Sequence, residues 1–191
     1  MTEKIYKIYK PYGFLSQFKN NQTTRKNKKL LGDLYNLDED LMAIGRLDED
    51  SEGLLFLTTS GALSERVRSK RVEKEYYVQV DGQISLEAIL SLERGVEIGI
   101  HGTKYITRPC SGKILATEPI LQERSKKIRD ERHGPTSWIS ITLTEGKFRQ
   151  IKKMTAAVGF PTLRLVRIRI GNEFIEDMIP GEIREISDFE I

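Results

Sequence analysis

The sequence predicts an α+β fold organised around a mostly antiparallel sheet. Segments with strand-like alternation outnumber segments with helical spacing, and the two kinds do not alternate regularly along the chain. A parallel doubly wound sheet needs that regular alternation, so it is disfavoured. The 191 residues, of which 38% are hydrophobic, suffice for one compact domain with room for two lobes. We expect about nine or ten strands and three or four helices.

The first elements are short. Isoleucines and tyrosines that alternate with lysines predict a strand over residues 3–10, and Pro11-Tyr12-Gly13 ends it with a turn. Apolar side chains favour a strand over residues 14–18, a short helix over residues 30–35 and a strand over residues 41–45.

Residues 19–29 (KNNQTTRKNKK) hold five basic residues and no apolar one. Such a composition is typical of a solvated loop. It also suits a loop that becomes ordered on a phosphate backbone. Both interpretations stay open.

The stretch AIGRLDEDSEGLLFLT, residues 43–58, has the pattern of strand, charged loop, strand. The apolar run 54–57 belongs in a buried strand, and a loop held between buried strands is a common place for function. Asp48 is therefore the candidate functional residue. An aspartate held by an arginine or lysine stays ionised and can act as a nucleophile or base. A turn cap or a structural salt bridge is the alternative role.

The acidic neighbours of Asp48 offer a further alternative, because a carboxylate cluster can hold magnesium or calcium. The spaced pattern of a calcium loop is missing, so we interpret these neighbours as turn and surface charges. They are Glu49, Asp50 and Glu52.

A helix is expected over residues 62–69, with Leu63 and Val67 inward. Residues 73–80 (EKEYYVQV) are rich in strand-forming residues and place Tyr76 on the same face as two valines. A helix over residues 85–92 is expected to begin with a serine cap and to end near a glycine. Its expected buried residues are Leu86, Ile89 and Leu90.

Short hairpins are expected over residues 96–106 and a strand over residues 112–117. Residues 121–133 (LQERSKKIRDERH) predict an exposed loop or helical turn, because they carry dense charge of both signs. A strand is expected over residues 138–143.

The last part of the chain combines a helix with further strands. Residues 147–158 have helical spacing, and their inward positions are Phe148, Ile151, Met154 or Thr155, and Val158. Residues 162–170 (TLRLVRIRI) alternate strictly and predict a strand. One or two short strands are expected within residues 174–186.

Basic side chains concentrate late in the chain, although the net charge is only +3. Residues 145–170 contain seven basic residues and a single acidic one. Three share a face of the predicted helix and two point the same way along the predicted strand. These are Arg149, Lys152 and Lys153 on the helix, and Arg167 and Arg169 on the strand. They suit a phosphate backbone, and a solvated basic face is the alternative.

Several classes of protein are excluded or disfavoured. The single cysteine, Cys110, excludes an internal disulfide and a cysteine-based metal cluster. His101 and His133 lack the spacing of metal ligands, and neither a phosphate-binding glycine loop nor a serine nucleophile elbow is present. No apolar run approaches the roughly 18 residues of a membrane span. We therefore expect a cytoplasmic protein without a metal, a cofactor or membrane association.

Four ordered motifs resemble those of pseudouridine synthases, in the branch that modifies ribosomal RNA. They are Lys10-Pro11-Tyr12-Gly13, GRLDEDSEGLLFLTT at residues 45–59, Lys74-Glu75-Tyr76, and EGKFRQIKKM at residues 145–154. The LVRI of residues 165–168 resembles a later segment, while Tyr9 stands where the family usually has asparagine. The matches span residues 7–171.

The resemblance implies catalytic roles. Asp48 resembles the catalytic aspartate that attacks or deprotonates the target nucleoside. Tyr76 resembles the active-site tyrosine that stacks on the flipped uracil. Lys152 resembles the basic partner of the aspartate, with Arg149 as the less favoured candidate.

The resemblance also implies contacts with the substrate. Ile151 and Leu165 resemble apolar walls of the pocket, and Arg46 resembles a residue that enters the RNA stack as the base leaves. Further RNA-binding residues are expected at Lys74, Lys147, Arg149, Lys153 and Arg167.

The family's fold is a bent, mostly antiparallel sheet with flanking helices, two lobes and a central basic cleft. Its reaction breaks the N1–C1′ bond of a uridine, turns the base and joins C5 to C1′, so no cofactor or metal is expected. Whether the aspartate adds to C6, bonds C1′ or takes the 2′ proton stays open. The implied substrate is a uridine in a single-stranded loop or distorted helix of ribosomal RNA, most closely that of the large subunit.

Many relatives carry a small RNA-binding domain before the first motif, whereas only ten residues precede Pro11 here. We therefore expect a single catalytic domain over residues 1–191, as in the short large-subunit enzymes, and a monomer. Target choice is expected to rest on residues 19–29 and 123–133. The alternatives are a non-catalytic RNA-binding or ribosome-assembly protein on the same fold, and a metal-dependent phosphoryl enzyme that uses carboxylates.

Overall fold

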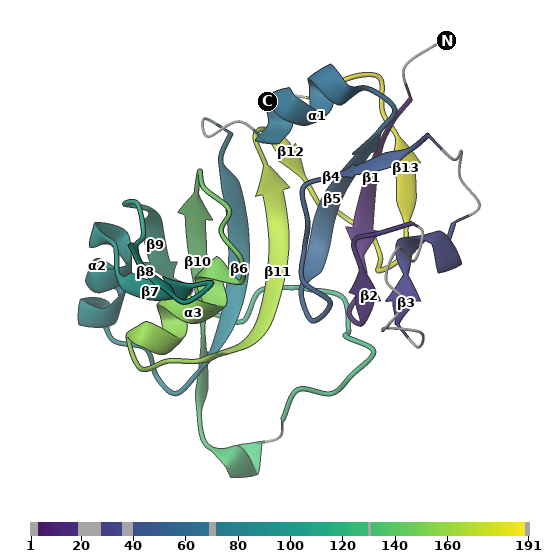
Figure 1. Cartoon of the computed structure of the whole chain (residues 1–191). Coiled ribbons are helices and arrows are strands. Elements are labelled where there is room, and N and C mark those ends of the chain that lie inside the picture. The colour runs from purple at the N-terminus through teal and green to yellow at the C-terminus, as the bar shows by residue number, and fades with distance from the viewer. Residues whose placement is uncertain (1–3, 19–27, 36–39, 69–71, 130, 190–191) are drawn as a thin grey trace. The chain divides into compact units, whose positions relative to one another are not determined.

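A computed structural model describes residues 4–18, 28–35, 40–68, 72–129 and 131–189 (Figure 1). The chain forms two compact units. The first comprises Met1–Val72, Gln122–Ser125 and Arg167–Ile191, and the second comprises Glu73–Leu121 and Lys126–Val166. Strand β11 (Thr162–Ile170) runs from the second unit into the first. The predicted arrangement as a single catalytic domain stays a prediction.

The first unit contains the strand order β13-β1-β5-β11, with β4 paired to β5 and β12 paired to β11. Its strands are β1 (Ile5–Lys10), β2 (Phe14–Leu15), β3 (Lys29–Leu30), β4 (Met42–Ile44), β5 (Glu52–Thr58), β12 (Glu173–Phe174) and β13 (Ile183–Glu185). Its helices are α1 (Gly61–Arg68) and the 3-10 turn η1 (Leu31–Asp33). Strand β1 pairs antiparallel with both β5 and β13, whereas β2 and β3 form a short parallel pair.

Strand β5 is the core of the first unit. All seven of its residues are buried, as the apolar run predicted for residues 54–57. Ile8 of β1 lies opposite Leu55, and both belong to a buried cluster with Leu31, Leu41 and Leu57. Each fully buried leucine of this kind stabilises the fold by about 1.5–3 kcal/mol. The loop that precedes β5 is therefore fixed at one end by a rigid strand.

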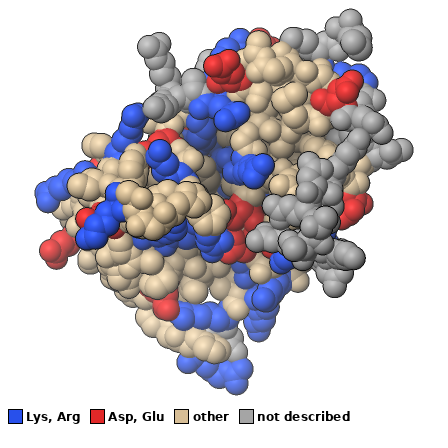
Figure 2. All heavy atoms as spheres, in the orientation of Figure 1, with Lys and Arg blue, Asp and Glu red and all other residues tan. Residues whose placement is uncertain are grey.

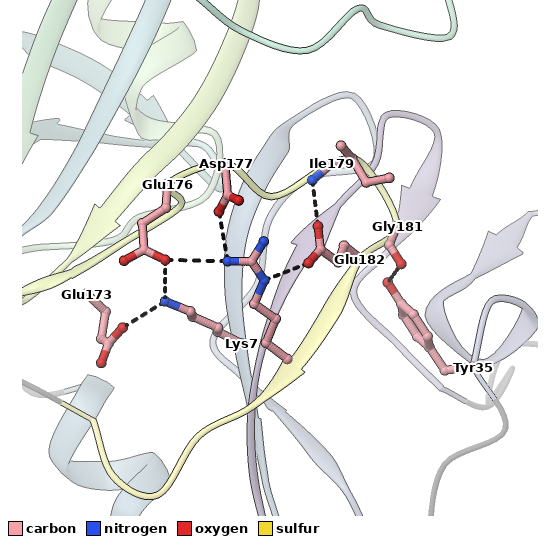
Figure 3. A network of polar contacts seen from close by, with 9 residues as sticks. Lys7, Tyr35, Glu173, Glu176, Asp177, Ile179, Gly181 and Glu182 are labelled. Atoms are coloured by element: carbon pink, nitrogen blue, oxygen red, sulfur yellow. Dashed lines mark hydrogen bonds and ion pairs between the residues drawn. The ribbon is translucent and has the colours of Figure 1, made fainter.

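Charged side chains join β1 to the C-terminal segment of the first unit (Figure 3). The buried Lys7 ammonium pairs with Glu173 at 3.3 Å and with Glu176 at 3.1 Å. Arg184 of β13 pairs with Glu182 at 2.6 Å and with Asp177 at 2.9 Å. The two cations therefore hold several carboxylates of this segment beside the β1–β13 pair.

The second unit contains the strand order β11-β6-β10-β9. Its other elements are β6 (Lys74–Asp81), α2 (Leu86–Arg94), the hairpin of β7 (Glu97–Ile100) and β8 (Thr103–Ile106), β9 (Ser111–Ile114), the 3-10 turn η2 (Glu131–His133), β10 (Thr136–Leu143) and α3 (Gln150–Ala157). Strand β10 pairs antiparallel with β6 and β9. Helix α2 packs on β9 and α3 packs on β7. The predicted α+β class with a mostly antiparallel sheet is confirmed.

Two helix predictions need correction. The last helix begins at Gln150, not at residue 147, because Arg149 has the left-handed backbone angle φ +52° and interrupts the helical path. In α2, Leu86 is 67% exposed and Leu90 is also exposed, while Ala88, Ile89 and Leu92 face inward. The Ser85 cap does form, since its side chain accepts a hydrogen bond from the Ala88 amide.

Shorter deviations concern the first unit. The strand predicted over residues 14–18 covers Phe14–Leu15, and the helix predicted over residues 30–35 is the 3-10 turn Leu31–Asp33. Most of the basic segment 19–29 lies outside the described residues. Within the described part of the chain, no helix is both long enough and apolar enough to cross a membrane.

Candidate active site

Asp48 lies in the loop between β4 and β5 of the first unit. The amide of Ser51 donates a hydrogen bond to the Asp48 carbonyl oxygen at 3.0 Å, which closes a tight turn around the acidic residues. Gly45 and Gly53 flank the turn with φ angles of +73° and +106°, in the left-handed region that favours glycine. The loop therefore reverses direction sharply and leaves Asp48 half-buried.

A buried lysine, Lys10, fixes this loop through hydrogen bonds. The Lys10 side chain is 0% exposed, and its Nζ donates hydrogen bonds to the carbonyl oxygens of Ser51 at 2.7 Å, Pro11 at 2.9 Å and Glu49 at 3.4 Å. A buried ammonium is costly unless its donors are satisfied, so these carbonyls fix it in place. The Gly13 amide also donates a hydrogen bond to the Glu49 carbonyl oxygen, at 2.8 Å. The motif at residues 10–13 thus anchors the loop that carries Asp48.

Ser16 fixes the residue that precedes Asp48. Its buried hydroxyl donates to the Leu47 carbonyl oxygen at 2.8 Å and accepts from the Leu47 amide at 3.0 Å. The Leu47 side chain is buried as well, so both the backbone and the side chain of Leu47 are fixed. Sequence reasoning missed Ser16, because no motif marks it and its partner lies far along the chain.

Arg167 lies inside the first unit against the other end of the loop. Its Nε donates to the Leu54 carbonyl oxygen at 2.7 Å, and its side chain is buried. A Cβ atom at Gly53 would lie 2.3 Å from the Arg167 carbonyl oxygen, so glycine is required there for steric reasons. This is a structural contact that the sequence did not predict, and the RNA-binding role of Arg167 stays a prediction.

The acidic neighbours of Asp48 differ from one another. Glu49 pairs with Lys28 at 2.8 Å near the surface, and Asp50 is half-buried. Glu52 is only 1% exposed, so its interpretation as a turn or surface charge is wrong. The reason is that β5 begins at Glu52, before the apolar run starts. Among the described residues, no group of three histidine, cysteine or acidic side chains is placed to hold a metal ion.

The second unit carries the predicted aromatic and apolar site residues. Tyr76 is buried on β6, opposite Ile141 of β10. Lys74 begins the same strand and is half-buried. Ile151 is buried on α3, and Leu165 is buried on the part of β11 that belongs to this unit.

A buried carboxylate organises the segment before α3. Glu145 accepts hydrogen bonds from the Tyr105 hydroxyl at 2.5 Å, the Arg108 amide at 2.9 Å and the Gln150 side-chain nitrogen at 2.5 Å. The hydrogen bond to Glu145 raises the pKa of Tyr105. The Gln150 oxygen in turn accepts from the Lys147 amide at 2.9 Å. Two polar side chains of the EGKFRQ motif therefore shape its backbone.

The predicted basic residues occupy different positions. Arg149 is half-buried and lies just before the first turn of α3, so it is outside the helix on which it was predicted to share a face with Lys152 and Lys153. Lys152 and Lys153 are half-buried on α3, while Lys147 is exposed on the preceding loop. In the first unit, Arg46 is exposed beside Asp48 in the sequence.

The two units divide the predicted residues between them. Asp48, Arg46 and Arg167 belong to the first, while Tyr76 and the residues of α3 belong to the second. The segment predicted to choose the target is likewise divided: Arg124 lies over the Tyr12 ring at 4.5 Å in the first unit, and Arg129 pairs with Asp81 in the second. The pairing of Asp48 with Tyr76 and Lys152 stays a prediction.

Comparison with known proteins gives consistent matches. The family model described as RNA pseudouridylate synthase matches residues 4–157. Ribosomal large subunit pseudouridine synthase E of Vibrio vulnificus is 41% identical over 186 residues, which are 96% of this chain and 75% of that protein. The protein of the same name from Xanthomonas axonopodis pv. citri is 41% identical over 175 residues, which are 91% of this chain and 88% of that protein.

A solved structure of a pseudouridylate synthase has a similar fold. It superposes with a TM-score of 0.76 and 25% sequence identity, and the match covers 97% of this chain and 71% of the solved one.

Proposed function

The chain belongs to the RNA pseudouridylate synthase family, and from this premise we propose that it converts a uridine of large-subunit ribosomal RNA to pseudouridine. The observation that carries the proposal is the 41% identity, over most of the chain, to two ribosomal large subunit pseudouridine synthases. The substrate is proposed to be a uridine in a single-stranded loop or a distorted helix, where less energy is needed to flip the base out. An enzyme of this kind is expected to act as a monomer in the cytoplasm.

We assign the catalytic carboxylate to Asp48. The support comes from the GRLD motif, from the hydrogen bonds of Lys10 and Ser16 to its loop, and from the turn that the Ser51 amide closes, which fix the backbone on both sides of the carboxylate. A preorganised side chain reacts without first paying the cost of ordering itself. The reaction breaks the N1–C1′ bond, forms the C5–C1′ bond and replaces the proton on C5 with one on N1.

Tyr76 and Lys152 are proposed as the partners of Asp48. The tyrosine would stack on the flipped uracil, since base–aromatic stacking recovers about 1–3 kcal/mol of the cost of flipping. The lysine would keep the carboxylate ionised. Ile151 and Leu165 are proposed as apolar walls of the pocket, and Arg46, Lys74, Lys147, Arg149, Lys153 and Arg167 are proposed RNA contacts.

The test follows the proton that leaves C5. Ribosomal RNA tritiated at C5 of uridine is incubated with the protein, and tritium release is measured. Wild type is expected to release tritium, whereas Asp48→Asn is expected to fold normally and release none. Glu49→Gln is the matched control, because it removes a neighbouring carboxylate that pairs with Lys28 near the surface.

Each result decides between roles. Full release by Asp48→Asn would overturn the assignment of the catalytic aspartate. A gross loss of thermal stability in Asp48→Asn would mean that the carboxylate is structural. RNA binding without tritium release by wild type would favour the non-catalytic alternative, and release that needs magnesium would favour a metal-dependent enzyme.

A further inference from the structure

Two stacked aromatic rings lie on the surface of the second unit. The rings of His101 and Phe148 have centroids 5.7 Å apart and planes 22° apart. His101 sits in the turn of the β7–β8 hairpin, and Phe148 sits in the segment before α3. The Phe148 side chain is 55% exposed, although the sequence pattern predicted it to face inward. An aromatic pair that remains accessible can still accept a third planar group.

Two lysines accompany the rings. The Lys153 ammonium lies 5.0 Å from the centre of the Phe148 ring and donates to the Gly99 carbonyl oxygen at 2.6 Å. The Lys147 ammonium lies 4.9 Å from the centre of the Tyr105 ring. In Figure 2, several blue Lys and Arg residues lie among tan residues in the region where Figure 1 draws α3 and the hairpin. The surface thus combines ring faces with positive charge.

The segments that bear these groups are joined to one buried carboxylate. Glu145 accepts hydrogen bonds from the Tyr105 hydroxyl on β8 of the hairpin and from the Gln150 side chain at the start of α3. The Gln150 side-chain oxygen also accepts a hydrogen bond from the Lys147 amide. His101 and Arg149 have left-handed φ angles of +48° and +52°, which the surrounding contacts must maintain. The aromatic pair is therefore presented by a fixed scaffold.

We propose that His101 and Phe148, with Lys147 and Lys153, form a platform for an unpaired base of the RNA substrate. The base joins the His101–Phe148 stack, and the two ammonium groups contact the neighbouring phosphates. This inference rests on the proposed function and adds a base-binding site separate from Tyr76. The platform contributes affinity and not sequence choice, because every base has a ring face to stack.

RNA fits this surface better than a protein partner does. A stable protein interface buries about 800 Å² on each partner and has an apolar centre with few charges. One exposed phenylalanine flanked by lysines is too small and too charged for that. Alternating ring faces and cations are instead typical of proteins that bind single-stranded nucleic acid.

The test measures binding of a short fluorescent oligouridine, single-stranded and in a duplex with oligoadenosine. Phe148→Ala is expected to weaken single-strand binding about tenfold, which corresponds to about 1.4 kcal/mol. Phe148→Trp is expected to restore it, because the larger ring can still stack. Leu86→Ala is the matched control, since it removes a side chain that is 67% exposed on α2 of the same unit.

The salt dependence of Kd distinguishes the contribution of the aromatic rings from that of the lysines. Lys147→Ala is expected to reduce the slope of log Kd against log salt concentration by about one, whereas Phe148→Ala is expected to leave the slope unchanged. If Phe148→Ala binds like Leu86→Ala, or weakens the single strand and the duplex equally, the platform is wrong.

Tritium release distinguishes this inference from the proposed function. If wild type is active, Phe148→Ala is expected to raise KM about tenfold and to change kcat by less than about twofold. The reason is that the platform stabilises the bound substrate and the transition state equally. Wild-type activity together with unchanged KM in Phe148→Ala overturns the platform alone. Failure of wild type to release tritium overturns the function, and the binding measurements then judge the platform by themselves.

Discussion

The ammonium of Lys10 donates a hydrogen bond to the carbonyl oxygen of Ser51 at 2.7 Å inside the first unit. The two residues lie at the ends of two adjacent paired strands, since β1 ends at Lys10 and β5 begins right after Ser51. The loop that carries Asp48 is thus tied to the sheet through a charge that water does not reach. Lysine is suited to this role because its long stem packs in the core while its three donors meet three carbonyls.

Replacement of Lys10 by methionine should damage both stability and catalysis. The substitution keeps the volume but leaves the carbonyl oxygens of Ser51, Pro11 and Glu49 without their donor. We expect the free energy of unfolding to fall by about 2–4 kcal/mol and kcat to fall at least tenfold. Urea unfolding and tritium release measure the two effects.

Lys28→Met is the control for this prediction, because Lys28 also contacts Glu49 but does so near the surface. It should cost less than about 1 kcal/mol. Equal losses in the two variants would show that burial of the Lys10 ammonium is not what matters.

The glycines on the two sides of Asp48 should differ in their tolerance of a methyl group. At Gly53 an added Cβ would meet the Arg167 carbonyl oxygen at 2.3 Å, whereas at Gly45 it would meet nothing within 4 Å. Both have positive φ, so Gly45→Ala should cost about 1–2 kcal/mol from backbone strain alone. Gly53→Ala should cost more than about 3 kcal/mol, because β5 and Arg167 must also separate. Thermal melts of the two variants test the difference, which vanishes if the close approach is unimportant.

Tyr35 should make stability sensitive to alkaline pH. Burial raises the pKa of Tyr35 to about 12, and its hydroxyl donates to the Gly181 carbonyl oxygen at 2.7 Å. A raised folded-state pKa means that the contribution is complete below the unfolded value near 10 and is lost as the pH rises toward 12. At pH 8, Tyr35→Phe should be less stable than wild type by about 1 kcal/mol. Urea unfolding at pH 8 and pH 11 should show this difference shrinking, and a constant difference would contradict the assignment.

Arg184 should stabilise the protein at neutral pH but not in acid. Its hydrogen bonds lower the pKa values of Asp177 and Glu182, which lie beside β13 (Figure 3). Lowered folded-state pKa values stabilise the fold above the ordinary carboxyl range and lose that effect as the pH falls through them. Arg184→Gln should therefore lower Tm at pH 7, and the deficit should shrink below about pH 4. A deficit independent of pH would indicate lost packing instead. Arg66→Gln is a control, because its ion pair with Asp188 is exposed.

Local patterns predicted the central elements well. The apolar run at residues 54–57 marked β5, and the serine and glycine around α2 marked both of its ends. These predictions succeed because a buried strand and a helix cap depend on residues close together in the sequence. The motifs also identified the family, which the match over residues 4–157 confirms.

The predictions that failed depended on backbone angles or distant contacts. The spacing of residues 147–158 fits a helix, but it cannot reveal the left-handed turn at Arg149 that delays the start of α3. Leu86 is in the first turn of α2 and projects away from the core, although its spacing from the other apolar residues of the helix predicted that it would be buried. Lys10 could not be predicted as buried, because its acceptors are backbone carbonyls, two of which lie about forty residues away.

The pairing of β1 with β13 has a consequence for synthesis on the ribosome. Tyr6 lies opposite Glu185, so almost the whole chain must emerge before this antiparallel ladder can form. Until then the outer edge of β1 presents unpaired backbone groups, and such edges invite pairing with other chains. Contacts so distant in sequence also slow folding. The nascent protein therefore has a long interval in which its first strand depends on β5 alone.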